Sequence, residues 1–260
     1  MASALLGESP PTLSVSRLVR LAGVFGINPN QARVALSRMV ARGEVSTDGA
    51  GSYTLSGRLL ERARRQSVSR SGATGEFDGE FHVVVVTASG DPATVRQTRR
   101  AALRTTRLGE LRGDVWLRPG NLEIALDVEV RASVVVLRAV PEEDPAALCA
   151  SVFDLLGWAR RAIELVDELA STTLEGPASL AEGFVLNADV LRHLQRDPLL
   201  PASLLEPAWP GPQLRASYEE FDASFRTVLA TVHRSMTACA PSRDVEDLAG
   251  SGLGLVRARK

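Results

Sequence analysis

The segment that decides the fold of the N-terminal region is Asn28–Val45, with the sequence NPNQARVALSRMVARGEV. Asn28 is a favourable N-cap, Pro29 suits the first helical position because it lacks an amide donor, and Gly43 suits the left-handed residue that ends a helix. Between these ends, apolar residues recur at helical spacing. We therefore predict a helix with locally encoded ends and one narrow apolar stripe, formed by Ala32, Ala35, Leu36 and Met39.

The rest of this helix surface is small, polar and basic. A helix that enters the major groove of DNA needs such a face, with arginine to bind guanine and a methyl group to contact thymine. An amphipathic helical hairpin with surface arginines would produce the same pattern, and this alternative remains open. On the first interpretation, the residues that contact bases are Asn30, Gln31, Arg33, Val34, Ser37 and Arg38.

The flanking sequence favours a winged helix-turn-helix. The stretch Val15–Phe25 predicts a shorter amphipathic helix that ends at Gly26. After Val45, VSTDGAGSYTL predicts two short strands around Asp48-Gly49, where a wing would lie, and the next helix has the sequence GRLLERARRQ. We expect further DNA contacts from the end of the helix predicted between Asn28 and Gly43, from the wing and from the helix that follows it. The residues expected to make them are Arg42, Ser52, Tyr53, Arg58, Arg62 and Arg65.

Charge is distributed unevenly along the 260 residues. The formal net charge is −1, but residues 1–75 carry +6, residues 76–140 are balanced, and residues 141–260 carry −7. A basic segment attracts phosphates of any sequence, whereas an acidic remainder limits nonspecific adhesion to the same polyanion. The charge asymmetry therefore favours nucleic-acid binding by the N-terminal region.

The composition predicts a soluble cytoplasmic protein. No apolar run reaches the length of a membrane span, and the N-terminus lacks the features of a secretory signal. Cys149 and Cys239 are far apart in the sequence. They fit small buried hydrophobic residues in a reducing compartment, and a disulfide between them is the less favoured alternative.

The order of predicted elements gives an α+β multidomain chain. We predict a winged helix DNA-binding domain over residues 1–67, a Ser- and Gly-rich linker over 68–77, and a ferredoxin-like central domain over 78–142. In the central domain we expect strands in FHVVVVT, DVWLRPGNLE and VEVRASVVVLRAV, a basic helix after the first strand, capped by Asp91, and a balancing helix after Pro145. Residues 143–260 predict a helical C-terminal domain, with helical stretches at 145–172, 179–197 and 217–238.

Three motifs resemble those of the PaaX-like transcriptional regulators, the phenylacetate-degradation repressor family. They are VALSRMVARGEV in the predicted DNA-reading helix, LRPGNLE after Val115-Trp116, and RDPLLPASLLEPAWPG over residues 196–211. They occur in the family's order along nearly the whole chain. Glu44 stands where many members have Trp, and the first helix of the winged domain is reduced to the stub SALLG.

This resemblance implies a homodimeric repressor that binds a double-stranded DNA operator and is released by an aryl-acyl-CoA such as phenylacetyl-CoA. It also implies a central domain similar to a small ferredoxin-like CRISPR-associated nuclease. The strand FHVVVVT lacks the terminal Asp that holds metal in those nucleases, so we expect neither nuclease activity nor a metal site. We expect no cofactor.

The segment 196–211 has two possible roles. Its prolines stiffen a loop whose leucines and Trp209 must be buried, which favours structural packing, and it could also form a wall of an effector pocket. Arg118 could hold an anionic group such as a CoA phosphate, or form a salt bridge at the end of a strand. The candidate effector-binding residues are Arg118, Arg196 and Trp209.

Motifs of common enzyme classes do not occur. The chain has no G-x-S-x-G elbow, Walker phosphate loop, dinucleotide glycine fingerprint, or Cys and His cluster with metal spacing. His193 and Asp197 are four residues apart, which predicts a surface or capping contact. We therefore expect a DNA-binding regulator that is not an enzyme. The alternative is a ligand- or protein-binding module that uses the winged domain for dimerization.

Overall fold

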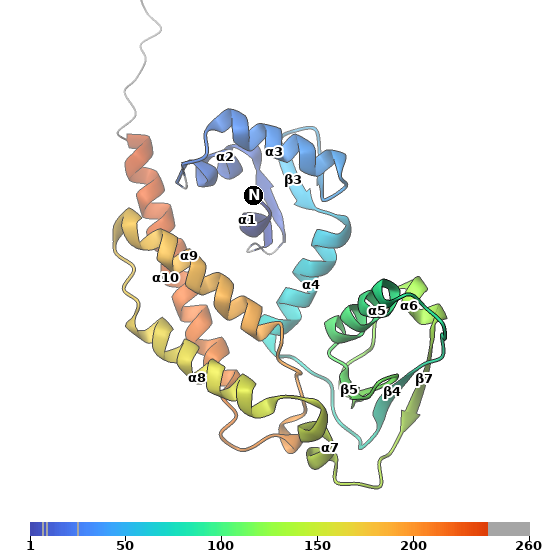
Figure 1. The fold of residues 1–260 in the computed structure, drawn as a ribbon. Helices are drawn as coiled ribbons and strands as arrows, with labels where there is room; N and C mark the ends of the chain where they lie inside the picture. Colours follow the sequence, from blue (N-terminus) through green and yellow to red (C-terminus); the bar gives the residue numbers. More distant parts are fainter. Residues whose placement is uncertain (7, 9, 25, 239–260) are drawn as a thin grey trace, which may run out of the picture.

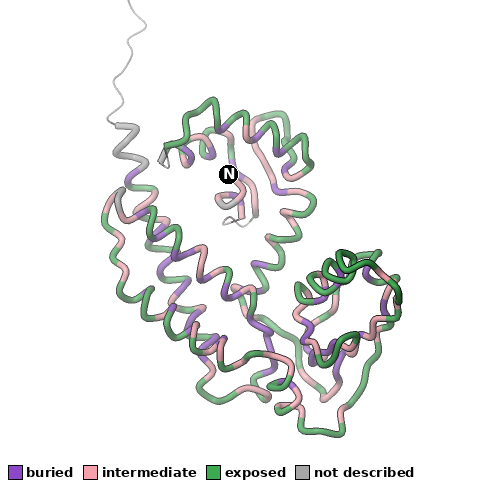
Figure 2. Tube along the Cα trace, viewed as in Figure 1, coloured by how far each residue is buried: buried purple, intermediate pink, exposed green. Residues whose placement is uncertain are grey.

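The structure is a computed structural model that describes residues 1–6, 8, 10–24 and 26–238. Phe25 and Cys239 therefore lie outside the described residues. The described chain is a mixed α+β structure with two small antiparallel sheets and a group of long helices near its C-terminal end (Figure 1). Buried residues concentrate on the sides of helices and strands that face one another (Figure 2).

The N-terminal unit combines a three-stranded sheet with four helices. Its strands are antiparallel in the order β1-β3-β2, so that the N-terminal strand pairs with the second strand of the hairpin. Leu5, Leu18, Leu36 and Leu55 form its core with 1% exposure or less. The elements are α1 (Ala2–Leu6), β1 (Thr12–Ser14), α2 (Val15–Val24), α3 (Pro29–Ala41), β2 (Val45–Thr47), β3 (Ser52–Leu55) and α4 (Gly57–Ser71).

Local signals in this unit correspond to the observed elements. Helix α3 begins after Asn28, and Gly43 follows its end with a φ of 67°, as expected for a left-handed residue that lacks a Cβ. The stub predicted before Leu13 is the short helix α1. Helix α4 continues to Ser71, so the first residues of the segment predicted as a linker are helical.

The central unit contains a four-stranded antiparallel sheet in the order β5-β6-β4-β7. Val84 of β4 lies opposite Trp116 of β6 and Val136 of β7. These three residues lie on one face of the sheet. That face packs against Leu103 and Val130, which belong to the two helices of the unit. The elements are β4 (Phe81–Val86), α5 (Ala93–Thr105), β5 (Gly109–Arg112), β6 (Val115–Pro119), α6 (Val128–Ala132) and β7 (Val134–Ala139).

Two predictions for this unit were wrong, and one strand was not predicted. Residues 128–132 form helix α6 and not the start of a strand, because Asp127 accepts a hydrogen bond from the main-chain N of Val130 at 2.8 Å and caps the helix. The cap overrides the strand preference of the valines. The helix predicted after Pro145 is also present, as α7 (Pro145–Val152), and its Cys149 packs with Phe81 and Leu117 of the sheet. Strand β5 was not predicted. Asp91 does not cap α5, since it pairs with Arg99 at 2.7 Å.

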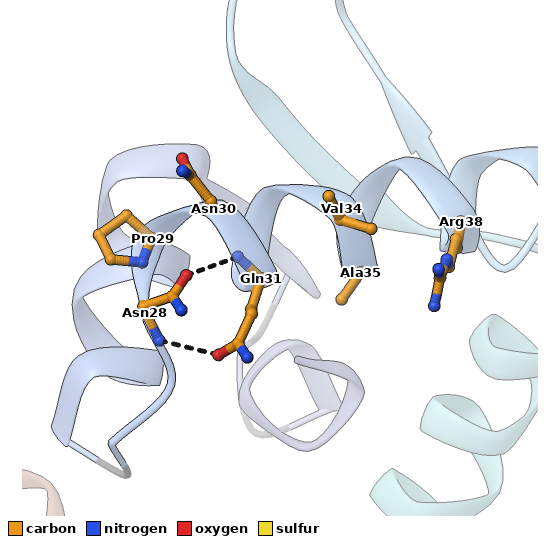
Figure 3. A pocket seen from close by; sticks show the side chains of 7 residues that line it. All are labelled: Asn28, Pro29, Asn30, Gln31, Val34, Ala35 and Arg38. Atoms are coloured by element: carbon orange, nitrogen blue, oxygen red, sulfur yellow. Dashed lines mark hydrogen bonds between the residues drawn. The ribbon is translucent and has the colours of Figure 1, made fainter.

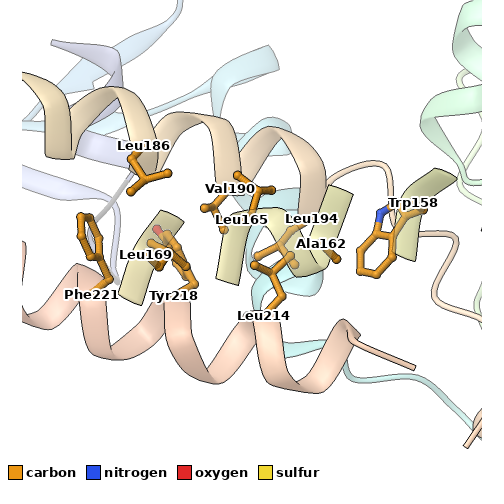
Figure 4. Close-up of a cluster of buried hydrophobic side chains, with 10 residues drawn as sticks. All are labelled: Trp158, Ala162, Leu165, Leu169, Leu186, Val190, Leu194, Leu214, Tyr218 and Phe221. Carbon is orange, nitrogen blue, oxygen red and sulfur yellow. The ribbon is translucent and has the colours of Figure 1, made fainter. Parts of the chain in front are cut away.

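The C-terminal region is helical. Its helices α8, α9 and α10 pack around a core that includes Leu165, Val190, Leu214 and Tyr218 (Figure 4). The stretch predicted as helical over 145–172 is interrupted, because Asp154 caps a new helix by accepting from the main-chain N of Gly157. The elements are α7 (Pro145–Val152), α8 (Leu155–Ser171), α9 (Gly176–Leu194), the 3-10 turn η1 (Ala202–Leu204) and α10 (Gly211–Ala238).

The three units meet around Asp197, which is 2% exposed. Its Oδ2 accepts from Arg215 of α10 at 2.6 Å, and its main-chain oxygen accepts from Arg107, which follows α5. Arg107 also donates to Oγ of Ser69, and Arg215 donates to the main-chain oxygen of the same serine on α4. We call Ser69, Arg107, Asp197 and Arg215 the junction.

Replacing Asp197 should destabilise the protein strongly. Asp197→Ala leaves the buried guanidinium of Arg215 without its carboxylate, and loss of one partner of a buried ion pair costs about 3 to 5 kcal/mol. Urea denaturation measures the change in the free energy of unfolding. Asp189→Ala is the matched control, because its pair with Arg192 lies at the surface and should contribute less than about 1 kcal/mol. Equal losses for the two variants would contradict the central role of Asp197 in the junction.

Candidate nucleic-acid interface

Helix α3 is held at its start by a capping box. Oδ1 of Asn28 accepts from the main-chain N of Gln31 at 2.9 Å, and Oε1 of Gln31 accepts from the main-chain N of Asn28 at 3.3 Å (Figure 3). Two amide groups that lack helical partners are thereby bonded. The side chain of Gln31, predicted to contact DNA, thus has a structural bond that the sequence analysis did not assign.

The burial of α3 separates a packed face from an exposed one. Ala32, Leu36 and Met39 are buried against the N-terminal core, whereas Val34 is 50% exposed. Ala35, predicted to belong to the apolar stripe, is half-buried. The residues predicted to contact bases are all exposed, namely Asn30, Gln31, Arg33, Val34, Ser37 and Arg38.

The exposed side of α3 includes a hollow at the surface. Asn28, Gln31, Ala35 and Arg38 contribute to its lining, and Figure 3 shows the last three side chains on one side of the helix. Pro29, Asn30 and Val34 complete the lining. The hollow thus lies on the helix face that was predicted from the sequence to read DNA.

The β2–β3 hairpin is organised by Asp48. Its Oδ1 accepts from the main-chain N of Ala50 at 2.8 Å and of Ser52 at 2.9 Å, and the bond from Ser52 is the main cause that lowers the pKa of this carboxyl. Gly49 has a φ of 74°, which a residue with a side chain rarely adopts. Ser52 and Tyr53 are half-buried in β3, and Tyr53 packs against the N-terminal core.

Helix α4 presents three arginines in one row. Arg58, Arg62 and Arg65 are exposed and spaced by four and three residues, which places them on one helix face. No described carboxylate forms an ion pair with any of them, whereas Arg64 on another face pairs with Glu61 at 2.6 Å. Arg42, also predicted to contact DNA, is exposed after α3 and lies 3.7 Å from Glu44. The row therefore offers unneutralised positive charge.

The three residues predicted to bind an effector lie in different surroundings. Arg118 is 1% exposed and donates to Oδ1 of Asn121 and to the main-chain oxygens of residues 106, 119 and 198. Burial is the main cause that lowers its pKa to about 10. Arg196 is exposed, and Trp209 is half-buried and stacks on Trp158 at 4.7 Å. The three residues thus differ in burial, from the buried Arg118 to the exposed Arg196.

The environment of Arg118 differs from both roles considered for it. Its guanidinium meets neutral oxygens rather than a carboxylate or a free anion site, so it fastens β6 to the start of the segment 196–211. His193 also differs from its predicted surface contact with Asp197. It is buried, stacks on Trp158 and is hydrogen-bonded through Nε2 to the main-chain oxygen of Trp158, with a pKa lowered mainly by burial.

A second row of arginines, which was not predicted as a site, lies on α5. Arg96, Arg100 and Arg104 recur every four residues on α5 and are exposed, and the side chain of Arg104 is 61% exposed. The signal was present in RQTRRAALR, whose spacing places these residues on one side of a helix. The central unit therefore carries a basic helix face of its own.

The described residues were also compared with the requirements of a metal site and of a membrane span. No group of three or more His, Cys, Asp and Glu side chains is placed to hold a metal ion within this part of the chain. None of the described helices is long and apolar enough to cross a membrane. Cys149 is free and buried, and burial is the main cause that raises its pKa to about 11.

Comparisons with known proteins identify relatives. Residues 2–59, which include α1–α3 and the hairpin, match the model of a family described as PaaX-like protein. The structure is similar to that of "Uncharacterized protein Rv0674 from Mycobacterium tuberculosis", with 38% sequence identity and a TM-score of 0.69. That similarity covers 88% of this chain and 95% of the other. No curated protein matches the chain.

Loss of the capping box should destabilise α3. Asn28→Ala removes the side-chain acceptor at the N-cap, and such changes cost about 1 kcal/mol. Urea denaturation should show this decrease. Asn30→Ala is the control, because Asn30 is exposed and is not part of the capping box, and its free energy of unfolding should change by less than about 0.5 kcal/mol. The cap assignment fails if the two variants are equally stable.

Proposed function

Because this chain belongs to the PaaX-like family, we propose that it is a sequence-specific DNA-binding transcriptional regulator that acts as a homodimeric repressor in the cytoplasm. The observation that carries the proposal is the exposed, uncharged-to-basic face of α3, which projects from a helix whose other face is buried. A helix of this kind can lie in the major groove with its side chains against base edges. The family supports a regulatory rather than an enzymatic role.

The proposal includes a division into three domains. Helices α2 and α3 with the β2–β3 hairpin support a winged helix-turn-helix over residues 1–67. The order β4-α5-β5-β6-α6-β7, with the sheet order β5-β6-β4-β7, supports a ferredoxin-like domain over 78–142. Residues 68–77 connect the two. The proposed C-terminal domain spans 143–260, and its described part, residues 143–238, is helical.

The two sets of basic residues have different proposed roles. On α3, Arg33 and Arg38 read bases together with the neighbouring polar side chains, since direct contacts to base edges carry specificity. On α4, Arg58, Arg62 and Arg65 contact phosphates, since they form an exposed row without ion pairs among the described residues. The first set determines which DNA is bound, and the second raises affinity for all DNA.

The effector is proposed to be an acyl-CoA, such as an aryl-acyl-CoA. The C-terminal helices are much larger than a DNA-binding domain requires, and they connect to α4 through the junction. A ligand that binds more tightly to the DNA-free arrangement of these helices would weaken DNA binding by linkage. Arg196 and Trp209 are accessible for such a ligand, whereas Arg118 supports the segment from within.

Substitution of the proposed base-reading arginines should reduce specific binding. Arg33→Ala and Arg38→Ala should each weaken binding to a specific operator by about 1 to 3 kcal/mol, and to random DNA by less, because each removes an interaction with a base edge. The operator is first selected from a random duplex library with the wild-type protein, and affinities are then measured by footprinting.

A matched control separates this effect from a general decrease in positive charge. Arg131→Ala removes one exposed arginine from α6 in the central unit and should leave operator affinity within about twofold of wild type. If Arg33→Ala and Arg38→Ala both protect the operator as well as wild type, α3 is not the recognition helix. If the wild-type protein selects no sequence, the proposed regulator is rejected.

The effector proposal predicts release of DNA by a thioester. Titrating phenylacetyl-CoA and other acyl-CoAs into the operator complex should lower operator affinity by roughly 5- to 150-fold, the usual range of allosteric coupling. Free CoA is the control, because it lacks the acyl group. Calorimetry should show the same factor in the affinity for the thioester with and without DNA. Tight operator binding that no thioester weakens would reject the acyl-CoA effector and retain the regulator.

A further inference from the structure

Two rows of exposed arginines approach one another at the junction between the N-terminal and central units. The row on α4 consists of Arg58, Arg62 and Arg65, and continuation of the same helical spacing leads to Ser69. Oγ of Ser69 accepts a hydrogen bond at 2.7 Å from Arg107, which follows the last turn of α5. The face of α4 that carries the arginines is therefore the face that meets the central unit.

Helix α5, which carries the second row, lies on the side of the central unit nearest to α4 (Figure 1). Arg100 and Arg104 both pair with Glu110 of β5, the edge strand of the sheet, and both lie over the ring of Trp116 at 5.9 and 5.5 Å. The single carboxylate of Glu110 therefore forms ion pairs with two arginines. The pairing and the ring contacts hold the side chains in place and leave one positive charge in excess.

Arg96 adds a further positive charge at the other end of this row. It is exposed, and its guanidinium donates to the main-chain oxygen of Asp91 at 2.6 Å, which does not neutralise it. The carboxylate of Asp91 pairs instead with Arg99, whose side chain is buried. The α5 row therefore carries more positive charge than its neighbouring acids balance.

Positive charge also accumulates where the rows meet. Arg107 and Arg215 both bond to the single carboxylate-bearing residue Asp197. The positive charges of Arg215 and Arg65 lower the pKa of Arg107, in addition to the larger effect of its burial, so Arg65 is close enough to act on the central unit. The α4 row therefore ends beside the end of α5, where Arg107 contacts Ser69.

From this placement we infer that α4 and α5 form one DNA-backbone surface, so that the central unit contacts phosphates beside the DNA that α3 reads. The inference extends the proposed function and depends on it. Double-stranded DNA presents two lines of closely spaced phosphates, and arginines on two elements at a fixed separation can contact both. The ordered arginines of α5 would give up little side-chain freedom on binding.

The dependence of DNA affinity on salt tests this surface. We compare full-length wild type with R96Q/R104Q on a duplex of random sequence about four helical turns long, which does not require a known operator. Arg100 is retained so that Glu110 keeps a partner. The slope of log affinity against log salt concentration should become shallower by about 0.9 for each phosphate that an arginine no longer neutralises, which is nearly 2 per bound protomer for the double variant.

The control removes the same charge from the opposite edge of the sheet. R131Q/R138Q changes two exposed arginines, one on α6 and one on β7, and should leave the slope as in wild type. The variant R58Q/R62Q reports the proposed α4 contacts separately. R96Q alone should reduce the slope by about 0.9 per bound protomer, and it leaves every ion pair of α5 intact, so it answers the question if the double variant does not fold.

The salt slopes of these variants decide whether α5 contacts DNA. A shallower slope for R96Q/R104Q and R96Q, with the R131Q/R138Q slope unchanged, supports the surface. An unchanged slope for R96Q and R96Q/R104Q, with a shallower slope for R58Q/R62Q, assigns the α5 row to solvent or to an acidic protein partner and overturns the inference while DNA binding stands. Equal reductions in R131Q/R138Q and R96Q/R104Q also overturn it, because net charge alone would then be responsible. Absence of DNA binding by wild type rejects the proposed function itself.

Discussion

The buried carboxylate of Asp197 is the interaction on which the arrangement of the three units depends. Its two oxygens accept from Arg215 at 2.6 Å and from the main-chain N of Leu199 at 2.9 Å, and its main-chain oxygen accepts from Arg107 at 2.9 Å. A carboxylate with 2% exposure is stable as an ion only when it is paired and hydrogen-bonded. These bonds therefore restrict how the central unit and α10 can move about the segment that follows α9.

Backbone conformation shows how strongly the junction is determined. Arg107 and Leu199 have φ values of 60° and 51°, and they are the non-glycine residues with positive φ in the part of the chain that the structure describes. Such conformations cost about 1 kcal/mol or more and persist where surrounding contacts require them. Arg107 is held by Ser69 and Asp197, and Leu199 by bonds to both its main-chain groups. The end of α4 is thereby tied to both other units, so movement of the C-terminal helices would be transmitted to the N-terminal unit.

The sequence allowed prediction of features whose causes are local. The cap at Asn28, the left-handed Gly43 and the apolar stripe of α3 depend on residues within a few positions of one another, and the exposure of the residues proposed to contact DNA follows from that stripe. Tertiary contacts were not predictable in this way. Arg118 was expected to bind an anionic group or to form a salt bridge. It instead donates to main-chain oxygens of chain segments that lie far apart in the sequence. Helix α6 was missed because its cap competes with a run of strand-forming valines.

In the assembled structure, acidic residues of the C-terminal region pair with particular arginines of the N-terminal unit. The acidic C-terminal region, with −7 over residues 141–260, neutralises arginines of the N-terminal unit at particular places. Arg70 at the end of α4 pairs with Glu219 and Asp222 of α10 and lies over the ring of Tyr218. Arg70 at this end of α4 therefore stabilises the assembly. Among the described residues, no carboxylate of α10 forms an ion pair with the arginines nearer the start of α4. Because pairing neutralises charge only where the helices touch, the interactions that hold the units together leave exposed arginines without an ion pair on the described parts of α3, α4 and α5.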